Sequence, residues 1–320
     1  MENRVIGRFA PTPSGRMHLG NVLCALLAWL SARSSGGKIV LRLEDLDTHR
    51  CPPGAAGQLE DDLLWLGLPW DEGGSLGGPH GPYFQSQCTS YYEEALHTLQ
   101  RQGLLYPCFC TRAELHAADA PHLSDGRVLY SGKCRHLSAE EIAEKANVHP
   151  PAIRLRVPDG RIAFLDRCQG LYTQDLAREF GDFLVRRSYG VFAYQLAVVV
   201  DDARMGVTEV VRGRDLLSST PAQLYLMRML HLPAPRYAHI PLLLAPDGRR
   251  LSKRDGDLSL EALRARFRSP EPILGLLAYL CGLQEKPKPK SAQALLEGFS
   301  WEKVRREDIR ADFPRLLKKL

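Results

Sequence analysis

The order of apolar and polar residues predicts an α/β unit at the start of the chain. VIGRFA is a short apolar run that stops at prolines, which disfavour helix at the preceding residue, so we expect a strand. NVLCALLAWLSA has Leu and Ala at helical spacing and is followed by Gly36-Gly37, a helix stop. KIVL predicts a second strand, with acidic residues after it. This order predicts a right-handed crossover in a parallel sheet.

The loop that leads into the first helix is PTPSGRMHLGN, and we expect it to bind phosphate. A helix N-terminus behind a glycine-bearing loop presents unpaired N–H groups and a positive dipole end to an anion. Gly15 and Gly20 have Walker A spacing, but Asn21-Val22 replace its lysine and hydroxyl residue, and no G-x-G-x-x-G occurs at this turn. The loop therefore disfavours P-loop NTPases and nicotinamide or flavin enzymes, and it leaves His18 as a candidate phosphate donor.

Three further patterns organise the rest of the chain. LAVVV predicts a strand that ends at Asp201-Asp202, and we leave this acidic pair out of the site. IPLLLAPDG is an apolar run followed by the basic loop RRLSKRDGD. SLEALRARF, ILGLLAYLCGL and SAQALLEGFSWEKVRREDI have helical character and predict a small C-terminal helical domain.

Composition indicates the size of the core, the cellular compartment and the type of partner to expect. The 320 residues, 44% of them hydrophobic, can bury a sizeable core. Because we find neither a signal peptide nor an apolar run of membrane-spanning length, we predict a cytoplasmic protein without a membrane partner. The net charge of +5 is compatible with a polyanionic partner. Three of the eight cysteines fall between Cys108 and Cys134, which favours a metal site over a disulfide framework.

Together, these segments resemble class I aminoacyl-tRNA synthetases. Their two signature elements read here as His18-Leu19-Gly20-Asn21 and Arg250-Leu251-Ser252-Lys253-Arg254. RFAPTPSG, LRLEDLD, AYQLAVVVDD and GVTEVVRGRDLL are similar to the glutamyl branch of that family. The resemblance implies a Rossmann-like catalytic domain that uses ATP, with Mg²⁺, to activate L-glutamate.

The resemblance also implies roles for residues in both signature elements. Charge grows on phosphoryl oxygens during adenylation, so fixed donors are needed there. His18 and Lys253 would supply them as catalytic residues. The ATP-binding set would be His18, Gly20, Asn21, Ser252 and Lys253. This chain departs from the family pattern at flanking positions, which are Asn21, Arg250 and Arg254.

A glutamate pocket requires two guanidinium forks and one anion, because the amino acid carries two carboxylates and one ammonium. Arg8, Arg212 and Glu44 fit that count. By resemblance to glutamyl-tRNA synthetases, the pocket would be lined by Arg8, Phe9, Ala10, Pro11, Thr12, Glu44, Tyr194 and Arg212. The alternative interpretations are a surface acid at the end of a strand for Glu44 and a structural ion pair for Arg212.

Residues 106–190 are expected to form an inserted acceptor-binding domain with one structural Zn²⁺. Cys108, Cys110 and Cys134 supply three thiolates, and zinc takes four ligands. Composition alone nominates His116, His122 or His136 as the fourth ligand. Resemblance to the glutamyl-Q tRNA(Asp) synthetases, which are shorter relatives of glutamyl-tRNA synthetase, points instead to Tyr130.

The small size of the unit after Lys253 indicates which group on the tRNA accepts the glutamyl group. At a radius of gyration of about 11 Å it is too small to read an anticodon, so we expect no anticodon-binding domain. The glutamyl-Q enzymes also lack one, and this resemblance implies transfer of glutamate to queuosine in the anticodon of tRNA(Asp). The alternatives are a truncated glutamyl-tRNA synthetase that charges the 3′ end of tRNA(Glu), a small-molecule nucleotidyltransferase or ligase of the same superfamily, and an inactive tRNA-binding module.

We expect a monomer with catalytic halves at 1–105 and 191–257, the insertion at 106–190 and a helical stem-contact domain at 258–320.

Overall fold

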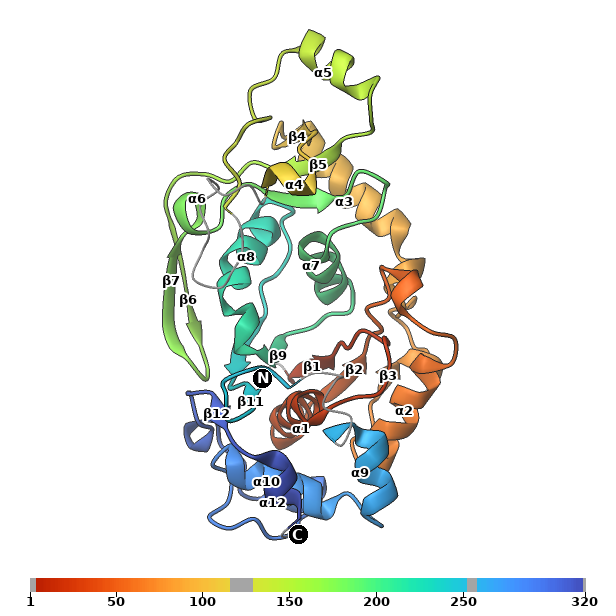
Figure 1. The fold of residues 1–320 in the computed structure, drawn as a ribbon, viewed down its shortest axis with the longest axis vertical. Coiled ribbons are helices and arrows are strands. Elements are labelled where there is room, and N and C mark those ends of the chain that lie inside the picture. The colour runs from red at the N-terminus through yellow and green to blue at the C-terminus, as the bar shows by residue number, and fades with distance from the viewer. Residues whose placement is uncertain (1–3, 116–128, 252–257, 319–320) are drawn as a thin grey trace.

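The computed structural model describes residues 4–115, 129–251 and 258–318. Its centre is a seven-stranded sheet in the order β3-β2-β1-β9-β10-β6-β7, parallel at every pairing except that of β6 with β7 (Figure 1). The strands are β1 (Ile6–Phe9), β2 (Lys38–Leu41), β3 (Glu72–Gly73), β9 (Glu209–Gly213), β10 (Arg236–Ile240), β6 (Arg161–Asp166) and β7 (Gly170–Asp175). This topology confirms the predicted α/β class with a mostly parallel sheet.

The predicted crossover is present between β1 and β2. It passes through α1 (Leu19–Ser34), and β1 pairs with β2 in parallel. Most residues of α1 are buried, since the sheet covers one side and α10 (Glu271–Leu280) and α11 (Ala292–Leu296) cover another. An apolar helix of this kind is stable only when it is covered in this way. The C-terminal helices therefore complete the core around the loop that precedes α1.

One predicted strand is wrong, because LAVVV lies in helix α7 (Tyr194–Arg204). Its β-branched residues favour a strand by propensity, but α7 is buried along its length, and packing overrides propensity in such a segment. The error matters for Asp201 and Asp202. As helical residues near the end of α7 they point into the protein, where they are at most 2% exposed.

The predicted insertion contributes to two sheets. A three-stranded antiparallel sheet is formed by β4 (Leu105–Cys108), β5 (Ala152–Leu155) and β8 (Phe183–Arg186). The β6–β7 hairpin instead extends the main sheet through β10. The short helices of this region are α4 (Arg112–Leu115), α5 (Ala139–Ala146) and α6 (Leu176–Glu179). In Figure 1 the antiparallel sheet and α5 lie at the top, away from the C-terminal helices.

The C-terminal region is helical only in part. SLEALRARF and ILGLLAYLCGL correspond to α9 (Leu260–Arg266) and α10. The third predicted helix ends early, because α11 stops at Leu296 ahead of Gly298, a poor helix former. The chain then forms the 3₁₀ turn η6 (Trp301–Lys303), strand β12 (Ile309–Arg310) and α12 (Phe313–Leu317). β12 pairs in parallel with β11 (Leu243–Leu244) in a separate two-stranded sheet, which attaches this region to the segment that follows β10.

The remaining elements flank these layers. The helices are α2 (Ala55–Trp65), α3 (Thr89–Arg101) and α8 (Thr220–Met229), and the 3₁₀ turns are η1 (Thr48–Arg50), η2 (Gly74–Leu76), η3 (Gln85–Gln87) and η4 (Arg214–Ser219). Within the described part of the chain, every helix is too short or too polar to cross a membrane.

Candidate active site

A cavity of about 610 Å³ opens where the carboxyl ends of β1, β9 and β10 meet the N-terminus of α1. Ligands bind at this edge in open α/β sheets. The structure brings together here these residues expected from the sequence: Arg8, Phe9, Ala10, Pro11, Thr12, His18, Gly20, Asn21, Glu44, Tyr194 and Arg212. Ser252 and Lys253 lie outside the described residues.

His18 is the N-cap of α1, and its side chain is held in one orientation. Its Nδ1 accepts a hydrogen bond from the backbone N–H of Gly20 at 3.1 Å, and its own backbone N–H donates to Oδ1 of Asn21 at 3.1 Å. Because Nδ1 is an acceptor, the proton of a neutral imidazole lies on Nε2, which makes that atom a donor. The first turn of α1 contains no acidic residue that would repel an anion.

The second signature element meets the first at this cavity. Arg250 and Leu251 line it, and Arg250 pairs with Asp215, whose carboxylate lies 3.0 Å from the guanidinium. On the far side of the undescribed segment 252–257, Ser259 forms an isolated antiparallel bridge with His18. Residues on both sides of the segment 252–257 therefore lie at the cavity or pair with the backbone of His18.

Four charged residues form a buried network under the cavity. Arg42, which has no exposed surface, donates from Nη1 to Asp202 at 2.6 Å and from Nη2 to Glu44 at 3.2 Å. Arg8 shares the same carboxylate, with its Nε 3.6 Å from Asp202 Oδ1. Burial raises the pKa of Glu44 above its ordinary value, although Arg42 and Arg8 oppose the shift. Asp202 does not line the cavity itself, but its carboxylate contacts two of the arginines beneath it.

Arg212 enters the cavity from β9 and is 4% exposed. Its Nη2 donates to Thr220 at 2.8 Å and to Gln223 at 2.7 Å, while its Nε donates to His239 Nε2 at 3.1 Å. Nη1 is buried and has no hydrogen-bond partner among the described residues.

Sequence reasoning missed several residues of this site, namely Arg42, Asp166, Asp202, Asp215 and His239. The burial of Asp202 could have been predicted, since an acidic pair in an apolar segment is a candidate for burial. The predicted strand, however, did not indicate that this side chain points into the protein. His239 lies inside the apolar stretch AHIPLLL, where a lone histidine gave no spacing to interpret.

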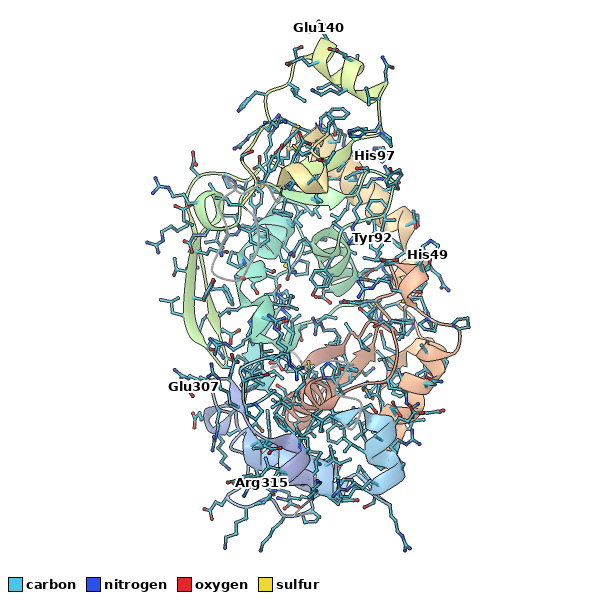
Figure 2. All side chains as sticks on the ribbon, in the orientation of Figure 1. His49, Tyr92, His97, Glu140, Glu307 and Arg315 are labelled. Atoms are coloured by element: carbon cyan, nitrogen blue, oxygen red, sulfur yellow. The ribbon has the colours of Figure 1, made fainter. Side chains whose placement is uncertain are left out.

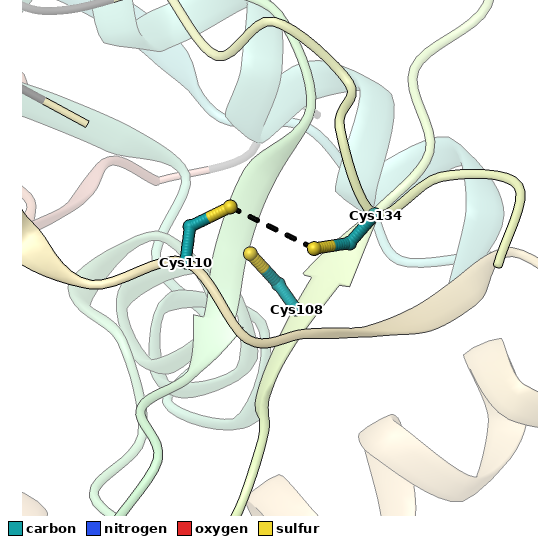
Figure 3. Close-up of side chains that lie close together, drawn as sticks. All are labelled: Cys108, Cys110 and Cys134. Atoms are coloured by element: carbon teal, nitrogen blue, oxygen red, sulfur yellow. Dashed lines mark hydrogen bonds between the residues drawn. The ribbon is translucent and has the colours of Figure 1, made fainter. Parts of the chain in front are cut away.

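The predicted metal-site residues also lie together (Figure 3). The Sγ atoms of Cys108, Cys110 and Cys134 lie within 4.8 Å of one another, and the last two are 3.6 Å apart. Two sulfurs bound to one zinc at about 2.3 Å in tetrahedral geometry are about 3.8 Å apart, so the thiols fit this ion. The Tyr130 hydroxyl is 3.6 Å from Cys108 Sγ and 3.8 Å from Cys110 Sγ.

The structure describes only some of the candidates for the fourth zinc ligand. His136 is not a member of the ligand cluster found among the described residues, and His116 and His122 lie outside them. Buried Arg154 donates from Nε to Cys108 Sγ at 3.2 Å and stacks on the Tyr130 ring, with Cζ 3.7 Å from its centroid. Burial opposes ionisation of Cys108, but the hydrogen bonds from Arg154, the Cys110 backbone and Tyr130, together with the charge of Arg154, outweigh it and hold the pKa of this thiol below its ordinary value.

A nucleotide-sized cavity at the carboxyl edge of a parallel sheet, with a helix N-terminus and a basic loop, is typical of a nucleotide-dependent enzyme. Residues 4–297 match the family model for the catalytic domain of class I tRNA synthetases (E and Q), and the chain belongs to this family.

Within this family, the chain is similar to named relatives and to a solved structure. The chain is 52% identical over 307 residues to the glutamyl-Q tRNA(Asp) synthetase of Symbiobacterium thermophilum, covering 95% of each chain. It is 50% identical over 279 residues to the glutamyl-Q tRNA(Asp) synthetase of Nitratidesulfovibrio vulgaris, covering 87% of this chain and 86% of that one. The crystal structure of the glutamate-tRNA synthetase from Elizabethkingia anophelis superposes with a TM-score of 0.84 at 29% identity, over 98% of this chain and 69% of that one.

Proposed function

We propose that this protein activates L-glutamate with ATP and transfers the glutamyl group to queuosine in the anticodon of tRNA(Asp). The observation that carries the proposal is the set of buried charges at the cavity. Arg8 and Arg42 are paired with the carboxylate of Asp202, and Arg42 also contacts Glu44. Arg212 is buried at the same cavity and forms no ion pair among the described residues, so its charge is left for a carboxylate of glutamate.

The groups at the cavity match that substrate one by one. The unpartnered Nη1 of Arg212 and the guanidinium of Arg8 provide donors for two carboxylates. Glu44, held by Arg42, provides the acceptor for the ammonium. An amino acid with an uncharged side chain would leave a buried guanidinium without an anion, which is costly.

In adenylation, a carboxylate oxygen of glutamate attacks the α-phosphorus of ATP, and the bond to pyrophosphate breaks. Positioning and electrostatic stabilisation are sufficient for such a step, because negative charge spreads over the phosphoryl oxygens. His18 Nε2–H and the N–H groups of Gly20 and Asn21 at the start of α1 would donate to these oxygens. Ser252 and Lys253 would follow the leaving pyrophosphate, and Mg²⁺ would accompany the nucleotide.

The choice of acceptor rests on the relatives named glutamyl-Q tRNA(Asp) synthetase. We would supply labelled glutamate, ATP and Mg²⁺ with tRNA(Asp) that carries or lacks queuosine, and with tRNA(Glu) in parallel. Label should appear only on queuosine-containing tRNA(Asp). Label on tRNA(Glu) would instead support a glutamyl-tRNA synthetase, and label on none of them would contradict transfer to tRNA.

Replacing Gly20 by alanine should lower the rate of glutamate-dependent ATP–pyrophosphate exchange by about 10-fold to 100-fold. A Cβ at this position would lie 3.0 Å from Cε1 of His18 and 3.1 Å from its Nδ1, so the imidazole must move. Gly57→Ala on α2 is the matched control, since a Cβ there meets nothing within 4 Å. Equal rates in the two variants would show that the position of the ring does not matter.

We also propose that Cys108, Cys110, Cys134 and Tyr130 hold one structural Zn²⁺, which would fix the antiparallel sheet against the segment that carries Cys134. Cys134→Ser should abolish stoichiometric zinc measured by mass spectrometry, whereas Cys51→Ser, outside the cluster, should retain it. Tyr130→Phe should weaken zinc binding by about 100-fold and keep the ring beneath Arg154. If Tyr130→Phe binds zinc normally, a histidine is the fourth ligand.

The division of the chain into domains follows from the sequence patterns. We propose catalytic halves at 1–105 and 191–257, an acceptor-binding insertion at 106–190 and a stem-contact unit at 258–320. We also propose that the protein acts in the cytoplasm, where its substrates are found, and that it acts as a monomer.

A further inference from the structure

Arg212 differs from the other buried arginines of the cavity in its partners. Arg42 and Arg8 both face the carboxylate of Asp202, at 2.6 Å and 3.6 Å. Arg212 instead donates to a hydroxyl, an amide and an imidazole, and among the described residues it forms no ion pair. A nearly buried guanidinium without a carboxylate is rare because its charge has lost water without gaining an anion.

His239 is the residue that maintains this arrangement. It is completely buried on β10, beside Arg212 on the neighbouring strand β9. Its Nδ1 lies 2.6 Å from Asp166 Oδ2, and Asp166 is itself fixed by backbone N–H groups of Cys168 and Gln169 at 2.9 and 2.8 Å. Because the carboxylate accepts the Nδ1 proton, Nε2 is left as an acceptor for Arg212 Nε.

The imidazole remains neutral in this position. Burial is the main cause that lowers the pKa of His239 to about 4; the charges of Arg212 and Arg8 act in the same direction, and Asp166 opposes them. Its ring stacks on Tyr237, with ring centroids 5.8 Å apart and planes 14° apart. The ring therefore cannot turn easily, and the Asp166 carboxylate is separated from Arg212 by a neutral group.

We propose that His239 is a positioning residue for amino-acid specificity: it aims Arg212 at the cavity through a neutral acceptor and leaves its charge for a carboxylate of the substrate. This inference rests on the proposed function, since the carboxylate is that of glutamate. Asp166 would serve the same purpose by holding the tautomer. A carboxylate in direct contact with Arg212 would hold the side chain equally well and would compete with the substrate.

Two substitutions of similar polarity separate this role from a structural one. In His239→Gln, the side-chain oxygen can replace Nε2 as a neutral acceptor for Arg212. In His239→Asn, the shorter amide can still donate to Asp166 but leaves Arg212 Nε without an acceptor. His97→Asn, at an exposed position of α3 (Figure 2), is the matched control.

We expect His239→Asn to raise KM for glutamate in ATP–pyrophosphate exchange by about 10-fold to 100-fold. KM for ATP and kcat should stay near the parent values. His239→Gln should restore KM for glutamate to within about threefold of the parent, even if both variants melt at the same lowered temperature. If His239→Asn does not fold, Asp166→Asn provides the second break, with the same selective rise in KM for glutamate expected.

Three results would overturn the inference. The first is an unchanged KM for glutamate in His239→Asn. The second is an equal change in the Gln and Asn variants, which would indicate a packing role. The third is a parent protein without glutamate-dependent exchange, which would overturn the proposed function and this inference with it, whereas the first two leave the proposed function intact.

Discussion

Replacing Arg42 by methionine should lower the free energy of unfolding by about 3–5 kcal/mol, because it leaves the buried carboxylate of Asp202 without its main partner. Arg42 has no exposed surface and contacts Asp202 and Glu44 together. Burial lowers the pKa of the guanidinium, but Asp202, Glu44 and Asp201 together outweigh it and raise this pKa above its ordinary value. Glu44 would also lose its support, so KM for glutamate should rise. Urea denaturation and pyrophosphate exchange measure the two effects.

Arg178→Met is the matched control for this substitution. Arg178 also faces a carboxylate, that of Asp175 at 3.8 Å, but its side chain is 87% exposed. Exposed pairs contribute little, so this variant should change stability by less than about 1 kcal/mol. Adding Asp202→Asn to Arg42→Met should recover part of the lost stability, because it removes the stranded charge. Equal stability of Arg42→Met and Arg178→Met would contradict the buried network.

The sequence was sufficient for the first crossover because local signals and packing agree there. Prolines after β1, helical spacing in α1 and glycines after it all mark the same boundaries. A loop between two such elements can only lie at the carboxyl edge of the sheet. The place of His18 in the loop before α1 therefore followed from position along the chain, whereas residues 8–12 were expected at the pocket from the resemblance to glutamyl-tRNA synthetases.

The supporting residues could not be found in this way. Asp202 reaches Arg42 across 160 positions, and Asp166 reaches His239 across 73. Such pairings depend on which strands become neighbours, and β6 joins β10 only in the folded sheet. The LAVVV segment shows the same limit, since its β-branched residues are compatible with a strand until burial on all sides selects a helix.

The contribution of the Arg212 fork can be tested by its most conservative replacement. Arg212→Lys should lower kcat/KM for glutamate by about 1000-fold in pyrophosphate exchange, because a lysine keeps the charge but loses the planar fork. Nη2 of that fork donates to Thr220 and Gln223, and Nε donates to His239. An ammonium would satisfy one or two of these acceptors and leave the others buried without a donor. The melting temperature should therefore fall as well.

Arg228→Lys on α8 is the control, since Arg228 is exposed on a helix that also carries Gln223. It should retain both the activity and the melting temperature of the parent. KM for ATP should be little changed in Arg212→Lys, because the donors expected for ATP are His18 and the N-terminus of α1, and none of the three Arg212 hydrogen bonds goes to them. A loss that affected ATP and glutamate equally would mean that Arg212 supports the cavity as a whole. Parent-like use of glutamate by Arg212→Lys would show that charge alone, without fork geometry, selects the acidic amino acid.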